Sequence, residues 1–205
     1  MGTAERRERE RRQRRQEILD AARGLFWTHG FAGTTMPQVA RAAELAPGTL
    51  YLYFPSKDAL YAELLVEGYD RLLERLQGCV RGGKSPRHQA ESLVECFLGF
   101  AREHPEYFDI IFFVLQRETG KGPRAVLRPE QLARLSARED ACKETAARVV
   151  AKAGPRRAPR EQRLLVEAVW SMLVGVVSIW GKDPRFAEVG GAARRILVQA
   201  VFPSP

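Results

Sequence analysis

Apolar residues recur along this chain at the spacing of α-helices, and the alternation of apolar and polar residues that is typical of strands is absent. Residues spaced by three and four lie on one side of a helix, so a first helix presents one apolar face, formed by Ile18, Leu19, Ala22, Leu25 and Phe26. Gly and Pro cluster between such segments. The pattern therefore predicts an all-α chain of about nine helices.

The N-terminal part of the chain combines short helices with a long one. Thr34 or Thr35 can cap a second helix, and a third helix starts around Pro47. Ser56 can cap the long helix that follows, which we predict over residues 56–80. This order predicts a small helical domain that continues into a long helix.

A segment rich in Gly and Pro, residues 82–86, is the clearest internal boundary. The helices predicted beyond it cover residues 87–103, 105–117, 129–153, 159–181 and 185–202, with a loop at 119–124. We divide the chain into a basic arm (1–14), a three-helix domain (15–60, linked by helix 56–80) and a C-terminal helical domain (61–205).

The charge balance favours a polyanionic partner. The 205 residues carry a formal charge of +8, and 45% of them are hydrophobic, which is ordinary for a globular protein. The N-terminus has no apolar signal core, and the longest apolar run, residues 168–180, is too short for a membrane span. We expect a soluble, cytoplasmic protein without a membrane partner.

Motifs for metal, redox or catalytic chemistry are missing from the sequence. The three cysteines are far apart and form no CxxC, so we expect them to be small buried hydrophobes: Cys79, Cys96 and Cys142. The three histidines lack the spacing of metal ligands, and no GxSxG, P-loop or HExxH is present. We expect no metal, no cofactor and no enzyme activity.

Residues 34–57 have the features of a helix-turn-helix. Two short helices that cross closely need small residues at the crossing, and the chain supplies Ala40, Ala42, Ala43 and Ala46. The end of a helix that enters the major groove must be narrow, as it is at Pro47, Gly48 and Thr49. The Thr49 hydroxyl can hydrogen-bond a base edge or a phosphate.

Polar side chains flank this narrow helix end. The hydroxyls of Tyr51 and Tyr53 diverge and can reach phosphates on either side of a groove. Lys57 lies in the first turn of the next helix, where a cation opposes the helix dipole, and a nearby phosphate would explain it. The alternative is an ordinary core in which the aromatic rings are buried and Lys57 is solvated.

The combined motifs resemble the N-terminal domain of TetR/AcrR-type regulators. They are I-L-D-A-A-x-x-L-F at 18–26, G-F at 30–31, T-T at 34–35, V-A at 39–40 and G-T-L-Y-x-Y-F-x-x-K-x-x-L at 48–60. The resemblance covers about residues 12–65. It implies a homodimer that binds a palindromic double-stranded DNA operator, most often as a repressor, and that releases the operator when a small molecule enters the C-terminal domain.

The resemblance also implies roles for single residues. It assigns phosphate contacts to Thr35, Tyr51, Tyr53 and Lys57, base contacts to Pro47, Gly48 and Thr49, and supporting contacts to Gln38 or Arg41, and Thr34 completes the DNA-binding set. The chain departs from the family pattern at two positions. Glu44 stands where a turn glycine is usual, and Ala46 stands where a capping serine is usual.

The arginine-rich segment, residues 6–16, has two interpretations. It can lie along phosphates or in a minor groove. Alternatively it is a solvated helical extension, because its Glu and Arg residues are spaced to pair along a helix.

The C-terminal third favours a dimer. From Ala168 onward the predicted 159–181 helix is apolar nearly all round, so it needs cover on both sides, and a partner subunit is the natural second cover. Small residues at 171, 175 and 178 permit close approach, and the last helix has one apolar face. We predict that these two helices pair with their symmetry mates, and the alternative is a monomer core.

Aromatic residues are dense in the middle of the chain and either fill a core or line a pocket. If they line a pocket, its candidate walls are Phe97, Phe100, Phe112, Phe113 and Trp170, and its polar groups are Asp109, Gln116 and Glu167. Such a pocket would suit a hydrophobic or cationic effector. Beside the regulator we keep a second hypothesis, an all-α small-molecule-binding or catalytic protein whose basic N-terminus is incidental.

Overall fold

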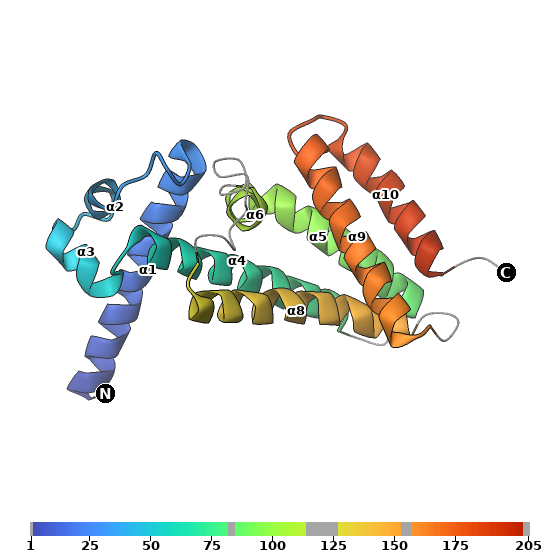
Figure 1. Cartoon of the computed structure of the whole chain (residues 1–205), viewed down its shortest axis with the longest axis horizontal. Helices are drawn as coiled ribbons and strands as arrows, with labels where there is room; N and C mark the ends of the chain where they lie inside the picture. The colour runs from blue at the N-terminus through green and yellow to red at the C-terminus, as the bar shows by residue number, and fades with distance from the viewer. Residues whose placement is uncertain (1, 82–84, 114–126, 153–156, 203–205) are drawn as a thin grey trace. The chain divides into compact units, whose positions relative to one another are not determined.

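A computed structural model describes residues 2–81, 85–113, 127–152 and 157–202. Within these ranges the chain forms nine α-helices and no strand, which confirms the all-α prediction (Figure 1). The helices are α1 (Thr3–His29), α2 (Met36–Ala42), α3 (Pro47–Tyr53), α4 (Lys57–Cys79), α5 (Pro86–Glu103), α6 (Pro105–Phe112), α8 (Pro129–Ala151), α9 (Pro159–Trp180) and α10 (Phe186–Val201). The predicted loop at 119–124 and the end of the predicted 105–117 helix lie outside the described residues.

The chain divides into two compact units. The N-terminal unit comprises Met1–Gly68 and Glu106–Leu135, and the C-terminal unit comprises Tyr69–Pro105 and Ser136–Pro205. Helices α4 and α8 each contribute residues to both units.

The core of the N-terminal unit forms where α1 meets α4. The predicted inner face of α1 is buried at Ile18, Leu19, Ala22 and Phe26. Tyr61 of α4 is also buried, and its hydroxyl donates a hydrogen bond of 2.6 Å to the carbonyl of Ile110 in α6. Its ring packs edge-on against Phe26 and Phe31, with centroid distances of 5.4 and 5.2 Å. These contacts hold α1, α4 and α6 together as the support for α2 and α3.

The arginine-rich segment is the first part of α1, because the helix already begins at Thr3. Exposed ion pairs join residues one turn apart: Arg6–Glu10 at 3.6 Å, Glu8–Arg12 at 3.2 Å and Arg14–Glu17 at 2.7 Å. Pairs of this spacing stabilise a helix by a few tenths of a kcal/mol each, about 0.2–0.5. The segment therefore has the structure of a helical extension, and the predicted end of the arm at residue 14 falls inside α1.

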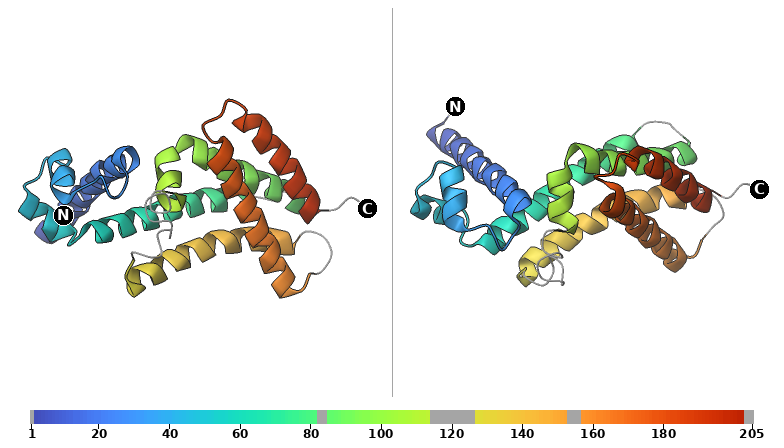
Figure 2. Two further views of the ribbon diagram at one scale, coloured as in Figure 1. Left: turned by 45° about the horizontal axis from the view of Figure 1, so that its top comes forward. Right: turned by 90° about the horizontal axis from the view of Figure 1, so that it is seen from above.

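In the C-terminal unit, α5 packs against both α9 and α10. The last two helices form an antiparallel pair, visible in orange and red in both views of Figure 2. The buried side chains between these helices include Phe97, Trp170 and Leu197, and the rings of Phe97 and Trp170 meet edge to face at 5.1 Å.

Helix α9 is apolar on its exposed side as well as on its buried side. Val166, Trp170 and Leu173 are buried, whereas Leu164 and Ile179 are 60% and 73% exposed. The helix has 22 residues, and by length and composition it is the one helix among the described residues that is long and apolar enough to cross a membrane. This length belongs to the whole helix, which begins at Pro159 as predicted, whereas its uninterrupted apolar run at 168–180 is shorter than a membrane span.

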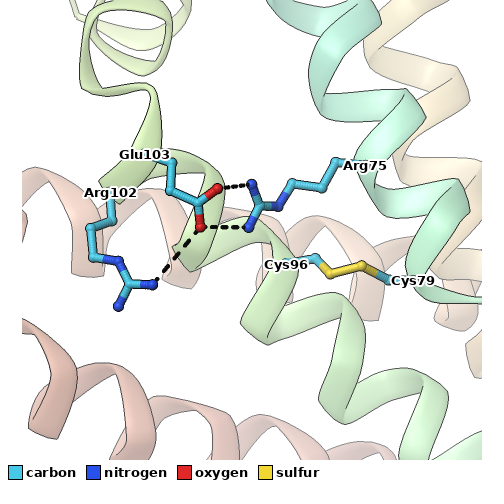
Figure 3. Close-up of polar contacts among 5 residues, drawn as sticks. All are labelled: Arg75, Cys79, Cys96, Arg102 and Glu103. Carbon is cyan, nitrogen blue, oxygen red and sulfur yellow. Dashed lines mark hydrogen bonds and ion pairs between the residues drawn. A yellow bond between two sulfur atoms is a disulfide. The ribbon is translucent and has the colours of Figure 1, made fainter.

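The cysteines differ from the prediction at two of three positions. Cys79, the last residue of α4, and Cys96 of α5 form a disulfide with their Cα atoms 6.8 Å apart (Figure 3). The same two helices are joined by a bidentate ion pair in which Arg75 lies 2.6 and 2.9 Å from the carboxylate oxygens of Glu103.

Cys142 is a buried free thiol, as predicted, and burial raises its pKa to about 12. A thiol with this pKa is protonated at neutral pH.

Candidate nucleic-acid interface

A six-residue hydrogen-bonding motif ends α2 and sets the direction of α3. The amide of Leu45 donates to the carbonyl of Ala40 at 2.8 Å, and the amide of Glu44 donates to the carbonyl of Arg41 at 3.1 Å. These two bonds have the pattern of a Schellman motif, which requires a left-handed residue directly after the helix cap. Glu44 occupies that position with φ 56°. The structure thus confirms that Glu44 takes the turn conformation usually given to glycine.

Helix α3 begins without a side-chain cap. Its N-cap residue, Ala46, makes no side-chain hydrogen bond, as predicted, and Pro47 follows at the first helical position. Leu50 is fully buried and Phe54, directly after the helix, is 2% exposed. This pair, four residues apart, anchors one side of α3 and leaves the other side on the surface. Of the small residues predicted at the helix crossing, Ala40 and Ala43 are buried, whereas Ala42 and Ala46 are exposed.

The surface of α2 and α3 carries most of the predicted DNA-binding residues. The exposed residues of this set are Thr35, Gln38, Arg41, Pro47, Gly48 and Tyr51, and the half-buried residues are Thr49, Tyr53 and Lys57. They come from α2, α3 and the residues that flank them, so helix-turn-helix geometry brings this set together (Figure 1). Thr34 is not on this surface. Its side chain is fully buried and its hydroxyl donates to the carbonyl of Gly30 at 2.7 Å.

Thr35 and Gln38 form a capping box at the start of α2. The Gln38 side-chain oxygen accepts hydrogen bonds from the backbone amide of Thr35 at 2.7 Å and from its hydroxyl at 2.9 Å. The Thr35 hydroxyl accepts in turn from the backbone amide of Gln38 at 3.4 Å. These bonds satisfy donors that the first turn of a helix otherwise leaves open, so both side chains hold α2 in place.

Lys57 connects the start of α4 to the loop before α2. Its ammonium donates to the carbonyls of Phe31 and Thr34 at 2.6 and 2.9 Å and lies 4.3 Å from the centroid of the Phe31 ring. The sequence gives no signal for these contacts, because they join residues that are 23 and 26 positions apart. Ser56 caps α4 as predicted, since its hydroxyl accepts from the amide of Ala59 at 3.1 Å.

One surface residue of α3 is missing from the predicted set. Leu52 is 78% exposed, the largest exposed fraction of any large hydrophobic side chain in the described residues. Each residue turns a helix by about 100°, so Leu52 lies about 200° around the axis from the buried Leu50. The sequence carries this signal, because the spacing of Leu50 and Phe54 already places Leu52 on the outer side.

The predicted ligand-binding residues do not form one group. Phe97 and Trp170 line an apolar cavity of about 60 Å³ inside the C-terminal unit. Phe100 is buried but is not part of that lining. The remaining described members belong elsewhere: Asp109, Phe112 and Phe113 are in the N-terminal unit, and Glu167 is exposed. Gln116 lies outside the described residues.

Glu167 is engaged in an ion pair. Its carboxylate oxygens lie 2.9 and 2.8 Å from the ammonium of Lys143, which also contacts Glu139 at 2.8 Å. The cavity lining itself is apolar and includes Leu93, Val149 and Leu197. The acidic character that the sequence suggested for a pocket is therefore absent from the lining of this cavity among the described residues.

Comparison with known proteins identifies both parts of the chain. A family model described as "Bacterial regulatory proteins, tetR family" matches residues 18–64, and one described as "Tetracyclin repressor-like, C-terminal domain" matches residues 90–199. The transcriptional regulator UidR of Escherichia coli is 34% identical over 80 residues, which are 39% of this chain and 41% of UidR. The transcriptional repressor KstR2 of Rhodococcus jostii is 37% identical over 81 residues, which are 40% of each chain.

Similarity to solved structures extends over nearly the whole chain. A regulatory protein of the tetR family from Rhodococcus RHA1 has a TM-score of 0.76 at 15% identity, covering 94% of this chain and 98% of that one. At this identity the likeness shows the fold alone, and the matched segments span only about 40% of the length of the curated relatives above. The family model for the C-terminal domain nevertheless covers more than half of the chain, and with the matching N-terminal model it shows that this protein belongs to the tetR family of bacterial regulatory proteins.

Proposed function

We propose that this chain is a ligand-responsive transcriptional regulator that binds a palindromic DNA operator as a homodimer. The observation that carries the proposal is the outer surface of α3, which is held rigidly by Leu50, Phe54 and the Glu44 turn while its other side stays accessible. A helix fixed on one side and open on the other is what entry into a major groove requires. The formal charge of +8 supports a polyanionic partner.

The surface residues have distinct roles in this proposal. Tyr51 and Tyr53 bind phosphates, and Pro47, Gly48 and Thr49 lie nearest the bases. Thr35, Gln38 and Lys57 contribute chiefly by holding α2 and α4 in position, because their polar groups are used in internal hydrogen bonds. Arg41 is exposed on the last turn of α2 and supplies a further phosphate contact.

The homodimer forms through α9 and α10. The exposed apolar side chains of these helices are Leu164, Met172, Ile179 and Ile196. Exposed apolar patches of this kind mark interaction sites, and a second copy of the chain fits them because a twofold dimer presents the same patch twice. Burial of α9 in a dimer accounts for its apolar exposed side in a soluble, cytoplasmic protein.

The effector binds in the C-terminal unit and weakens operator binding. The apolar lining around Phe97 and Trp170 favours a hydrophobic effector over a cationic one. An effector of this kind acts by stabilising a dimer in which the two recognition helices no longer match the spacing of the half-sites. The repressor name of the Rhodococcus jostii relative KstR2 supports negative control. We propose no catalytic role, because the family consists of regulators.

The decisive experiment is a binding titration with the DNA that flanks the gene of this protein. Specific, salt-sensitive binding is the expected result, and equally weak binding to all sequences would instead favour the second hypothesis, a protein whose basic N-terminus is incidental. Tyr51→Phe removes one hydroxyl from the exposed surface and should weaken binding to every sequence alike. Arg41→Gln and Lys152→Gln each remove one positive charge. Arg41→Gln should weaken DNA binding, whereas Lys152→Gln, at an exposed position at the end of α8, should leave it unchanged.

Thermal shift separates the two kinds of effector. Neutral alkanols and alkylammonium ions of equal chain length differ in charge but not in apolar size. Binding of the alkanols in the cavity should raise the melting temperature, because a ligand that binds only the folded state stabilises it. A rise with the cationic series alone would contradict the hydrophobic assignment.

A further inference from the structure

The exposed side chain of Leu52 is not explained by the packing of α3. Leu50 and Phe54 hold this seven-residue helix in place, and Leu52 is on the opposite side with 78% of its surface exposed. A single exposed leucine is common on protein surfaces and has no meaning by itself. The residues around Leu52 on the helix show that its exposure is meaningful.

The neighbours of Leu52 leave it the most prominent side chain on its side of the helix. Gly48 lies one turn earlier and has no side chain, and a Cβ placed there meets no atom within 4 Å. Thr49, three residues earlier, is short and half-buried. Tyr51, the adjacent large side chain, is 49% exposed. Any surface that approaches Gly48 closely therefore meets the Leu52 side chain.

The chemistry of leucine restricts what it can recognise in DNA. Its side chain has no hydrogen-bond donor or acceptor, so it cannot bind a phosphate or the polar edge of a base. In the major groove the apolar group offered by an unmodified base pair is the C5-methyl of thymine, and apolar side chains read thymine through it. We propose that Leu52 determines sequence specificity by contacting the methyl group of one thymine in each half-site.

This inference rests on the proposed function, because it places α3 in a major groove. It goes beyond that function by naming the base and the atom that are read. It also predicts a form of specificity that is independent of hydrogen bonds, since the contact recognises a methyl group by its apolar surface.

The test begins with an operator selected from random duplex DNA by the wild-type protein. Each thymine of that operator is then replaced by deoxyuridine, which removes the methyl and keeps every hydrogen-bonding group. At one symmetric thymine position the affinity should fall about fourfold per half-site, which is about 0.8 kcal/mol and the value of one buried carbon. The other thymines should show smaller losses.

Two variants assign the loss to the side chain. Leu52→Ala should fold normally, because the residue is exposed, and it should bind thymine and deoxyuridine operators equally at that position. Arg41→Gln is the matched control, since it should lower the affinity for both operators by the same factor and keep the fourfold difference.

The outcomes of the experiment distinguish a failure of the Leu52 assignment from a failure of the proposed function. If no deoxyuridine substitution changes the affinity, or if Leu52→Ala keeps the fourfold penalty, the assignment to Leu52 is overturned while the proposed function stands. If the wild-type protein selects no operator at all, the proposed function fails and this inference fails with it.

Discussion

Glu44 has the left-handed conformation of the Schellman turn between α2 and α3, with φ 56°. A side chain in this conformation costs roughly 1–2 kcal/mol. Glu44→Gly removes that cost but increases the freedom of the unfolded chain, so we expect a net gain of about 0.5–1 kcal/mol in the free energy of unfolding. Urea denaturation measures it.

The control for this prediction is Glu44→Ala, which keeps the Cβ atom and so keeps the strain. It should leave the unfolding midpoint close to that of the wild type. Equal stabilisation by the alanine and glycine variants would point to the loss of the charge and not to the backbone.

At the scale of single residues, sequence patterns predict the features that depend only on residues nearby in the sequence. The cap at Ser56 follows from local rules of helix ends, whereas the turn at Glu44 and the uncapped Ala46 follow from the family pattern that the resemblance supplies. The contacts of Lys57 follow from neither, because its carbonyl partners at Phe31 and Thr34 come close only in the folded chain. The burial of Thr34 was missed for the same reason, since the hydroxyls of both threonines are suitable caps.

Elements of the N-terminal unit are joined at Glu63 of α4. Arg134 of α8 lies 2.6 Å and Arg15 of α1 lies 2.9 Å from its carboxylate oxygens. Burial alone would raise the pKa of Glu63, but hydrogen bonds and charge interactions with the two guanidiniums outweigh it and hold the pKa below its usual value. The carboxylate form is therefore favoured by folding.

The sign of this shift predicts a loss of stability in acid. A group whose pKa is lowered by folding contributes fully above its unfolded pKa, about 4.3 for glutamate, and the contribution is lost as the pH falls through the folded value. The difference in unfolding free energy between the wild type and Glu63→Gln should thus be constant above about pH 5 and shrink below about pH 4.3. Urea denaturation between pH 3 and 7 is the measurement, and a difference that grows in acid would contradict the ion-pair assignment.

Helices α4 and α5 are linked by the disulfide between Cys79 and Cys96, which are 17 positions apart. A loop of this length restricts the unfolded chain enough to contribute roughly 2–3 kcal/mol to stability. Addition of dithiothreitol should lower the unfolding free energy of the wild type by about that amount. Cys96→Ser should be insensitive to the reductant. Thiol titration in denaturant should find one free thiol before reduction, and three would show that the bond is not formed.

Periodicity predicts the helices well, but it cannot decide how they pair. The wide spacing of the cysteines argued against a bond, yet Cys79 and Cys96 meet because one ends α4 and the other lies in the second half of α5. The arginine-rich segment was ambiguous because the same Glu and Arg residues suit a helix surface and a phosphate backbone. The ion pairs along α1 show that the segment is helical.

For the whole molecule the main prediction concerns the dimer. Ile179→Glu puts a charge on the exposed apolar side of α9, where Ile179 is 73% exposed. Because burying an unpaired charge is costly, our proposal predicts that the variant sediments as a monomer at concentrations where the wild type sediments as a dimer. It should also bind a single half-site no more weakly than the full operator. Trp27→Glu, an exposed position on α1, is the control and should remain dimeric.

The distribution of apolar residues in the C-terminal unit predicts the exposed apolar side of α9 but does not predict the pocket. The exposed side of α9 follows from a helix that is apolar all round, as at Leu164 and Ile179. The predicted pocket does not follow, because aromatic density does not distinguish a wall from a core. Phe97 and Trp170 line a cavity, whereas Phe100 is buried outside its lining and Phe112 belongs to the N-terminal unit.

The exposed leucine of α3 has one further consequence for the genome in which this regulator works. Cytosine that has been methylated at C5 presents a methyl group at the same place in the major groove as thymine does. A side chain that recognises only that methyl group, as Leu52 does in our proposal, responds to both bases. An operator with a cytosine at the Leu52 position would therefore gain affinity when a DNA methyltransferase modifies it, and the regulator would become sensitive to an epigenetic mark through one leucine side chain.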